Sequence, residues 1–320
     1  MFETIRPGLF KLEIPLPGNP LKAVNSYVFK TPDRNLIVDT GMNRQECLDA
    51  MMTGLKELDI DLSITDLFIT HMHADHSGLI SHLATETSRV YCSQIDADII
   101  NSTDGWEDML IYASRSGFPD DEDAIRQHPG FKYGVRKLIE FTIVKDGDLI
   151  SIGDYNFRCV STPGHTQGHL CLYDPDKKLL LSGDHILGKI TPNISVFADD
   201  QNPLQEYLDS LSKIYSMEVD HVLPAHRFLF DNCRDRIDQL RLHHQNRANA
   251  ILSVLEKGPQ NAFEIASQLK WDLSYKEWDQ FPITQKWFAT GEVISHLNYL
   301  KALGRVKQDP SSDTIKFSLT

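Results

Sequence analysis

The nine residues THMHADHSG, at positions 70–78, constrain the fold of this chain more than any other stretch. They place three histidines and one aspartate within six positions, directly after the apolar run LFIT at 67–70. The apolar run predicts a strand, and side chains at the end of a strand project from a rigid sheet. Imidazole and carboxylate are common metal ligands. We therefore expect a fold that brings further ligands to this strand end.

Three later apolar runs also end in a residue that can bind a metal. The runs CVSTPGHT, LLLSGD and HVLPAH supply His165, Asp184 and His226. One predicted ligand set offers three neutral nitrogens, from His71, His73 and His165. The other offers one carboxylate and two nitrogens, from Asp75, His76 and His226. Asp184 can bridge the two sets, so the sequence predicts a centre for two metal ions.

The ligand types also indicate the metal and its use. Imidazole and carboxylate without thiolate suit Zn²⁺ first, and Mn²⁺ or Fe²⁺ also fit. Two divalent ions with two aspartates and a bridging hydroxide leave a net positive charge, which favours an anionic substrate. Because divalent ions make hydroxide available near neutral pH and stabilise an oxyanion, hydrolysis is the predicted reaction. His169 and His185 flank the set and are expected to support ligands or face the substrate.

The first part of the chain alternates between predicted strands and helices, which indicates an α/β sandwich with helices outside. Between Asn43 and Leu58, apolar residues recur at three- and four-residue steps and predict a helix face that includes Met51 and Met52. Asn202 and Pro203 predict the start of a helix that runs to about Tyr215. The predicted strands lie at 25–29, 35–41, 67–70, 89–93, 148–152, 156–162, 169–174, 178–184 and 221–226.

Residues 95–140 interrupt this alternation. They are rich in aspartate, glycine and aromatic residues, with helices predicted around 105–116 and 132–140. We interpret the segment as an inserted cap or lid, whose aromatic side chains either line a pocket or pack as a surface insert.

The tail has a different pattern, so domains are predicted at 1–237 and 238–320. Helices are expected at 238–256 and 262–269, and a third, with one apolar face, ends at Gly304. The runs RVKQ and TIKFSL then predict a β-hairpin around the turn DPSSD. Three helices and a hairpin are the layout of a winged helix. Its third helix offers as outward candidates Ser295, His296, Asn298 and Lys301.

Charge and cysteine content exclude several kinds of protein. The net charge of −13 opposes strong non-specific binding to nucleic acid, and residues 238–320 hold ten basic and nine acidic side chains. The five cysteines form no Cys-x-x-Cys pair, which argues against a disulfide framework and a cysteine zinc site. The first twenty residues lack a secretory pattern, so a cytoplasmic protein without membrane segments is expected.

The motif HMHADH resembles the His-x-His-x-Asp-His motif of the metallo-β-lactamase superfamily, and His165, Asp184 and His226 match its later motifs. The resemblance implies an αββα sandwich with a dinuclear site at one sheet edge. It also implies that Asp75 is both a ligand and the proton acceptor for the nucleophilic water, and that Asp39 supports the ligand loop. The tail resembles the winged helix of β-lactamase-like hydrolases in the glyoxalase II-like branch.

Departures from the family narrow the expected activity. The common dinuclear β-lactamases carry a cysteine where Asp184 stands, which disfavours antibiotic hydrolysis. The length leaves no room for the inserted nuclease domain of the cleavage-and-polyadenylation type, and the tail lacks the helical glutathione-binding domain of glyoxalase II.

The expected function is hydrolysis of a small anionic ester or thioester by a dinuclear, metal-dependent enzyme that uses a metal-bridging hydroxide. A ribonuclease or phosphodiesterase is the enzymatic alternative, since the same metals serve that chemistry. A nucleic-acid-binding regulator with a structural metal site is the non-enzymatic one. The predicted partner is a small molecule, and the tail is expected to wall the cleft or form a homodimer rather than bind nucleic acid.

Overall fold

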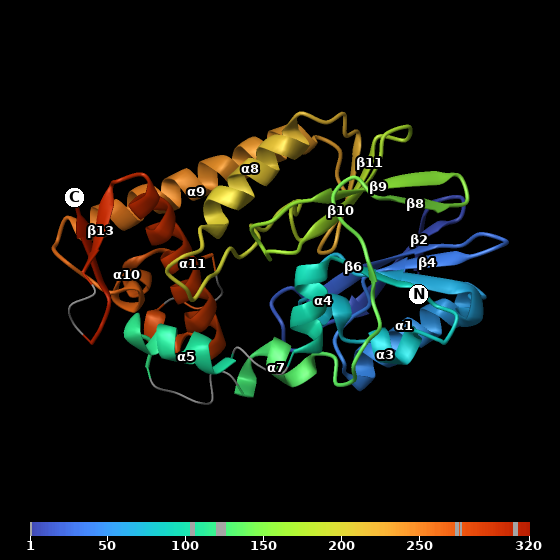
Figure 1. Ribbon diagram of the computed structural model, residues 1–320, viewed down its shortest axis with the longest axis horizontal. Helices are drawn as coiled ribbons and strands as arrows, with labels where there is room; N and C mark the ends of the chain where they lie inside the picture. Colours follow the sequence, from blue (N-terminus) through green and yellow to red (C-terminus); the bar gives the residue numbers. More distant parts are fainter. Residues whose placement is uncertain (1, 103–105, 120–125, 273–274, 276, 310–312) are drawn as a thin grey trace. The chain divides into compact units, whose positions relative to one another are not determined.

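A computed structural model describes residues 2–102, 106–119, 126–272, 275, 277–309 and 313–320 (Figure 1). The chain divides into two compact units. The first unit comprises residues 1–103, 132–192 and 210–237, and the second comprises residues 104–131, 193–209 and 238–320. The expected boundary at 237/238 falls inside one continuous helix, α9 (Cys233–Leu255), and the second unit also takes in two earlier segments.

The first unit contains a seven-stranded sheet in the order β1 to β7. Strands β1 to β4 pair antiparallel, whereas β4 to β7 pair parallel. Because β4, β5 and β6 run in the same direction, the segments that follow them leave the sheet at one edge. The strands are β1 (Phe2–Arg6), β2 (Leu9–Pro15), β3 (Ala23–Phe29), β4 (Asn35–Val38), β5 (Thr65–Phe68), β6 (Val90–Cys92) and β7 (Thr142–Ile143).

The second sheet of this unit has five strands in the order β12-β11-β10-β9-β8. Its pairs are antiparallel except for β11 with β12, which are parallel. The loops to His165, Asp184 and His226 follow β9, β11 and β12. The strands are β8 (Leu149–Ile152), β9 (Tyr155–Ser161), β10 (Leu170–Asp174), β11 (Leu179–Gly183) and β12 (His221–Pro224).

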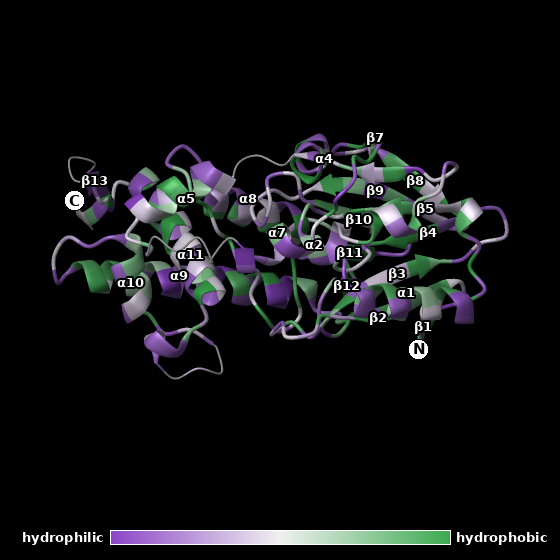
Figure 2. Cartoon of the chain, turned by 90° about the horizontal axis from the view of Figure 1, so that it is seen from below, coloured by the Kyte–Doolittle hydropathy of each residue, from purple (hydrophilic) through white to green (hydrophobic). Residues whose placement is uncertain are grey.

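Apolar side chains from both sheets form one core between them, and in Figure 2 strands of this unit, such as β3 and β9, carry hydrophobic segments next to hydrophilic ones. Phe29 and Phe157, one from each sheet, meet with ring centroids 5.2 Å apart. A second core lies between the first sheet and helix α1 (Gln45–Glu57), which buries Met51. These layers confirm the α/β sandwich with helices outside.

Helix α1 corrects one prediction. Met52 was expected on the core face with Met51, but it is 42% exposed. Successive helical residues are about 100° apart, so the face that buries Met51 turns Met52 toward solvent.

The segment 95–140 is not one body. Helix α4 (Gln94–Asn101) belongs to the first unit, α5 (Trp106–Arg115) to the second, and α7 (Pro129–Tyr133) spans their boundary. The helix predicted at 132–140 is wrong, because no helix continues beyond Tyr133. There the Asn101 side chain bonds both the N–H and the C=O of Ile139, at 2.9 Å each, which replaces helical backbone pairing. The predicted lid role stays a prediction.

Helix α8 (Pro203–Tyr215) begins where Asn202 and Pro203 predicted it, and the Asn202 side chain accepts from the N–H of Gln205 at 3.4 Å. The remaining short elements before it are η1 (Leu62–Ile64), α2 (Ala74–Ser77) and α3 (Ile80–Leu83).

The second unit contains the expected three helices and hairpin. After α9 come α10 (Ala262–Gln268), η2 (Trp278–Gln280), α11 (Ile283–Ala302) and the antiparallel strands β13 (Val306–Asp309) and β14 (Lys316–Leu319). Residues 310–312 of the predicted turn lie outside the described residues. The assignment of this unit as a winged helix stays a prediction.

Helix α11 corrects the prediction of an outward polar face. Ser295 and His296 are fully buried, and Asn298 is 3% exposed. The reason is packing from two segments: the Asn298 amide donates to the C=O of Ala198 and of Gln201, and His296 Nε2 lies 3.2 Å from Nδ1 of His244 on α9. Of the four candidates only Lys301 reaches solvent, where it bonds Gln308.

Within the described residues, no helix is both long enough and apolar enough to cross a membrane.

Candidate metal centre

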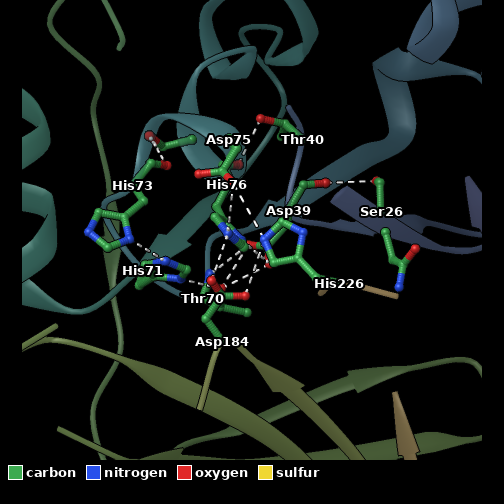
Figure 3. A network of polar contacts seen from close by, with 12 residues as sticks. Ser26, Asp39, Thr40, Thr70, His71, His73, Asp75, His76, Asp184 and His226 are labelled. Carbon is green, nitrogen blue, oxygen red and sulfur yellow. Dashed lines mark hydrogen bonds and ion pairs between the residues drawn. The ribbon is translucent and has the colours of Figure 1, made fainter. Parts of the chain in front are cut away.

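The centre begins with Asp39, which follows β4 beside the segment after β5. Its carboxylate accepts from the N–H of Thr70 at 2.9 Å, from the Thr70 hydroxyl, and from His76 Nδ1 at 2.9 Å (Figure 3). The parallel pairing of β4 with β5 brings these groups together. Because Asp39 occupies Nδ1 of His76, the other ring nitrogen, Nε2, points into the centre.

The second sheet contributes from the opposite side. His226 Nδ1 donates to the C=O of Ala23 at 2.7 Å, which leaves Nε2 facing two carboxylates. That nitrogen lies 3.4 Å from Asp75 Oδ2 and 3.4 Å from Asp184 Oδ1. The other oxygen of Asp184, Oδ2, lies 3.5 Å from His165 Nε2 and 3.7 Å from His76 Nε2. Asp184 therefore faces histidines from both predicted ligand sets.

The structure brings all seven predicted ligand residues together, as Figure 3 shows for six of them. Three overlapping groups each offer ligand atoms that lie within 4.8 Å of one another. The groups are His71 with His73 and His165, His71 with His76 and Asp184, and Asp75 with His76 and His226.

Unsatisfied buried atoms test whether a metal fits here. His76 Nε2, His226 Nε2 and Asp184 Oδ1 are buried, and each lacks a hydrogen-bond partner within the described part of the chain. A buried polar atom without a partner costs about 1–3 kcal/mol, so this convergence needs a compensating interaction. Divalent cations bound by imidazole and carboxylate provide it, and the donor set therefore fits metal ions.

The electrostatics of the site agree with that donor set. Burial lowers the pKa of His73 to about 3, so this ring stays neutral, as a metal ligand must be. Burial also opposes charge on His226, but Asp184 and Asp75 outweigh it and raise the pKa to about 10. Burial would raise the pKa of Asp75, yet His76 and His226 hold it well below its usual range. Without metal, the site thus combines a neutral His73 with ionised carboxylates that hold a proton on His226, and a cation bound there would take the place of that proton.

The two flanking histidines lie outside the three ligand groups. His169 Nε2 accepts from the backbone N–H of Asp184 at 3.2 Å, so Nδ1 carries the proton and donates to the Thr162 hydroxyl at 2.8 Å. His169 thus orients Asp184. His185 is fully buried, and burial lowers its pKa to about 3 against a hydrogen bond with the Ser210 backbone.

Two buried polar residues that contact the ligand loops were missed from the sequence. Asp96 on α4 bonds the loops that carry His73 and His165, and Asn25 on β3 bonds the loop that carries His226. A single aspartate in an amphipathic helix reads as a solvent-facing residue, and an asparagine in a strand carries no specific signal. Neither pattern distinguishes a supporting residue from an ordinary one.

The chain resembles known proteins over most of its length. Residues 19–226 match the family model described as Metallo-beta-lactamase superfamily. Beta-lactamase-like protein 2 homolog of Caenorhabditis elegans is 27% identical over 238 residues, which are 74% of this chain and 67% of that protein. Atrochrysone carboxyl ACP thioesterase of Aspergillus fumigatus is 24% identical over 245 residues, which are 75% of this chain and 64% of that protein.

A solved structure matches the whole chain. A metallo-beta-lactamase family protein from Thermus thermophilus superimposes with a TM-score of 0.85 at 25% identity, over 99% of this chain and 100% of that one. The chain spans only part of the length of the curated relatives that it matches. For lactamase-like protein aptB of Emericella nidulans, this part is 62%.

Proposed function

The chain belongs to the metallo-β-lactamase superfamily, and from that premise we propose that it is a metal-dependent hydrolase that uses two metal ions to hydrolyse a small anionic ester or thioester. The two-ion proposal rests on one observation, the position of Asp184. Its two carboxylate oxygens face different histidines, Oδ1 toward His226 and Oδ2 toward His165. A carboxylate placed in this way suits a bridge between two ions.

The proposed ligands follow from the groups that converge. His71, His73 and His165 would hold one ion. Asp75, His76 and His226 would hold the second, with Asp184 shared. Zn²⁺ is the first choice because its usual ligands in catalytic sites are imidazole and carboxylate, and Mn²⁺ and Fe²⁺ accept the same donors.

The residues of the chain then have defined roles. When bound, the ions supply hydroxide near neutral pH and positive charge for a developing oxyanion. Asp75, with its pKa held below the usual range by His76 and His226, is ionised at neutral pH and can accept the proton of the attacking water. Asp39 and His169 hold His76 and Asp184 in place through the hydrogen bonds described above.

A thioester is the preferred substrate class among acyl compounds. One relative over three quarters of this chain is named as an acyl-carrier-protein thioesterase. The charge of −13 repels a polyanion at long range. The burial of Ser295, His296 and Asn298 also removes most of the polar face that α11 was expected to offer to nucleic acid.

Parallel rate measurements test the proposal. Protein loaded with zinc or with manganese is assayed on acyl-thioesters and on single-stranded RNA, with Asp75→Ala as the control. We expect thioester turnover that falls by about 10²–10⁴-fold in the variant while its circular dichroism stays native. RNA cleavage alone, lost in the same variant, would replace the acyl substrate with a phosphodiester. An unchanged thioester rate in Asp75→Ala would remove the proposed role of Asp75.

A further inference from the structure

We propose that Asp96 and Asn25 are positioning residues that each support one half of the metal centre. Asp96 holds the loops of His71, His73 and His165, and Asn25 holds the loop of His226. This inference rests on the proposed two-ion centre. It adds that the two halves are supported separately, so that the binding of one ion can be weakened without weakening the binding of the other.

Asp96 lies at the start of α4 and is fully buried. One oxygen, Oδ2, accepts from the N–H of Met72 at 2.9 Å and from the Thr166 hydroxyl at 2.8 Å. The other oxygen, Oδ1, accepts from the N–H of Gly168 at 3.0 Å. One carboxylate thus joins two loops that are distant in sequence.

The positions of these partners connect Asp96 with one ion. Met72 stands between His71 and His73, and Thr166 follows His165 directly. Shifting either loop moves a ligand of the three-histidine set, and ligand geometry tolerates only about 0.5 Å of displacement.

Gly168 gives independent support for a tight contact at this point. A Cβ on Gly168 would collide with the Asp96 carboxylate and with the Ser93 hydroxyl that caps α4. The loop therefore lies directly against the carboxylate, at a position where only glycine fits.

Asn25 supports the other half from the first sheet. Its side-chain amide donates to the C=O of Pro224 and to the C=O of Arg227, both at 2.9 Å, and its backbone N–H donates to the C=O of Ala225 at 2.6 Å. These carbonyls lie on both sides of His226. Arg227 has φ +72°, a conformation unfavourable for a side-chain-bearing residue, so the loop needs such restraint. Asn25 is 2% exposed.

The two supports share no hydrogen-bond partner among the described residues, which is why they are expected to act separately. Replacing a residue that orients metal ligands weakens affinity by about 10–100-fold in known metal sites. A merely structural residue would instead lower the stability of the fold and leave stepwise metal affinities unchanged.

The test measures stepwise zinc dissociation constants by competition with a chromophoric chelator in wild type, Asp96→Asn and Asn25→Leu. Asp98→Asn, on the exposed side of α4, is the matched control. In Asp96→Asn and in Asn25→Leu, we expect the affinity for one of the two zinc ions to fall by about 10–100-fold and the affinity for the other to fall by less than about threefold. Thermal unfolding of the metal-free proteins checks that each variant folds.

A His73→Ala background identifies the ion that each variant affects. In that background the three-histidine set is broken, so Asp96→Asn should have no further effect on zinc binding, whereas Asn25→Leu should keep its full effect. If Asp96→Asn fails to fold, Thr166→Val removes only one bond to Asp96 and should weaken the same ion by a smaller factor.

The outcomes separate this inference from the proposed function. One ion per wild-type chain would contradict the two-ion centre itself. Two ions in wild type, with both constants unchanged in both variants or both weakened equally in each, would contradict the separate supports and leave the two-ion centre standing.

Discussion

Each of the two units buries histidines together with carboxylate, but the two clusters differ in whether ring nitrogens and carboxylates converge into candidate ligand groups. In the metal centre, Asp39 and the Ala23 carbonyl take Nδ1 of His76 and His226, and the Nε2 atoms converge. The second histidine cluster, made of His244, Arg247, Glu292 and His296, lies in the second unit. No three of its side chains join a candidate ligand group among the described residues.

Hydrogen bonds within the second histidine cluster explain the difference. His296 Nδ1 donates to the C=O of Glu292 at 2.8 Å, so its Nε2 must accept from His244 Nδ1 at 3.2 Å. Glu292 directs its carboxylate to Arg247, with Oε1 3.4 Å from Nε, and to the amide of Asn193. His244 Nε2 stays buried without a hydrogen-bond partner within the described residues, but no group of three candidate ligands forms around it there. Convergent, unused nitrogens indicate a metal site, whereas buried histidine alone does not.

Removal of metal should produce the largest effect, and it tests the contrast between the metal centre and the second histidine cluster. A strong chelator should abolish turnover, and zinc should restore it. Metal present at a thousandfold excess over its dissociation constant stabilises a fold by about 4 kcal/mol per site, so the first unit should lose stability. Hydrogen exchange should rise in residues 70–76 and stay unchanged around Glu292 and His296. Equal loosening of both clusters would contradict the distinction.

The substitution Glu292→Ala is expected to lower the stability of the fold without changing the amount of zinc that the protein binds. The Glu292 and Arg247 side chains are 9% and 10% exposed, and removal of one partner leaves the other buried without a counter-charge. The free energy of unfolding in urea should fall by about 3–5 kcal/mol, with zinc content unchanged. The matched control is Asp238→Ala, whose exposed pair with Arg241 should contribute less than about 1 kcal/mol. Loss of zinc from the Glu292 variant would show that the clusters are coupled.

The contrast also shows what the sequence could predict. Each ligand follows an apolar strand or stands in one short motif. The positions of the strand ends were therefore enough to predict that the seven ligand residues lie close together, and they do so in the structure. The supports could not be found in this way. Asp96 acts through residues 24 and 72 positions away, and sequence spacing does not show which loops a buried helix face will contact.

The prediction of an outward polar face on helix α11 was wrong for a related reason. Its apolar residues Val293, Ile294, Leu297 and Leu300 define one face correctly, and all are buried. The polar residues between them were assigned to solvent by default, but Ala198 and Gln201 bond Asn298, and His244 on α9 contacts His296. A one-sided apolar pattern indicates which face is buried first, and it does not exclude burial of the other face by a distant polar segment.

A smaller effect, dependent on pH, is expected for the second histidine cluster. Burial lowers the pKa of His296 to about 3, below the value of about 6.5 in an unfolded chain. As pH falls below 6.5 the unfolded state takes up the proton first, so acid favours unfolding. Between pH 7 and pH 5, metal-free wild type should lose about 2 kcal/mol of stability relative to His296→Gln. Parallel pH profiles of the two proteins would contradict a buried, neutral His296.

The smallest effect on stability is expected from removal of the Ser295 hydroxyl near the second histidine cluster. Removal of the Thr70 hydroxyl in the metal centre serves as the comparison. Ser295 is fully buried, and its Oγ has no hydrogen-bond partner within the described residues, so Ser295→Ala should leave stability unchanged or raise it by up to about 1 kcal/mol. Thr70→Val should instead cost about 1–3 kcal/mol, because the Thr70 hydroxyl bonds Asp39 at 2.9 Å. Urea unfolding of both variants measures the difference. A loss in Ser295→Ala as large as that in Thr70→Val would mean that a buried water or ligand holds the Ser295 hydroxyl, and that the second unit binds something there.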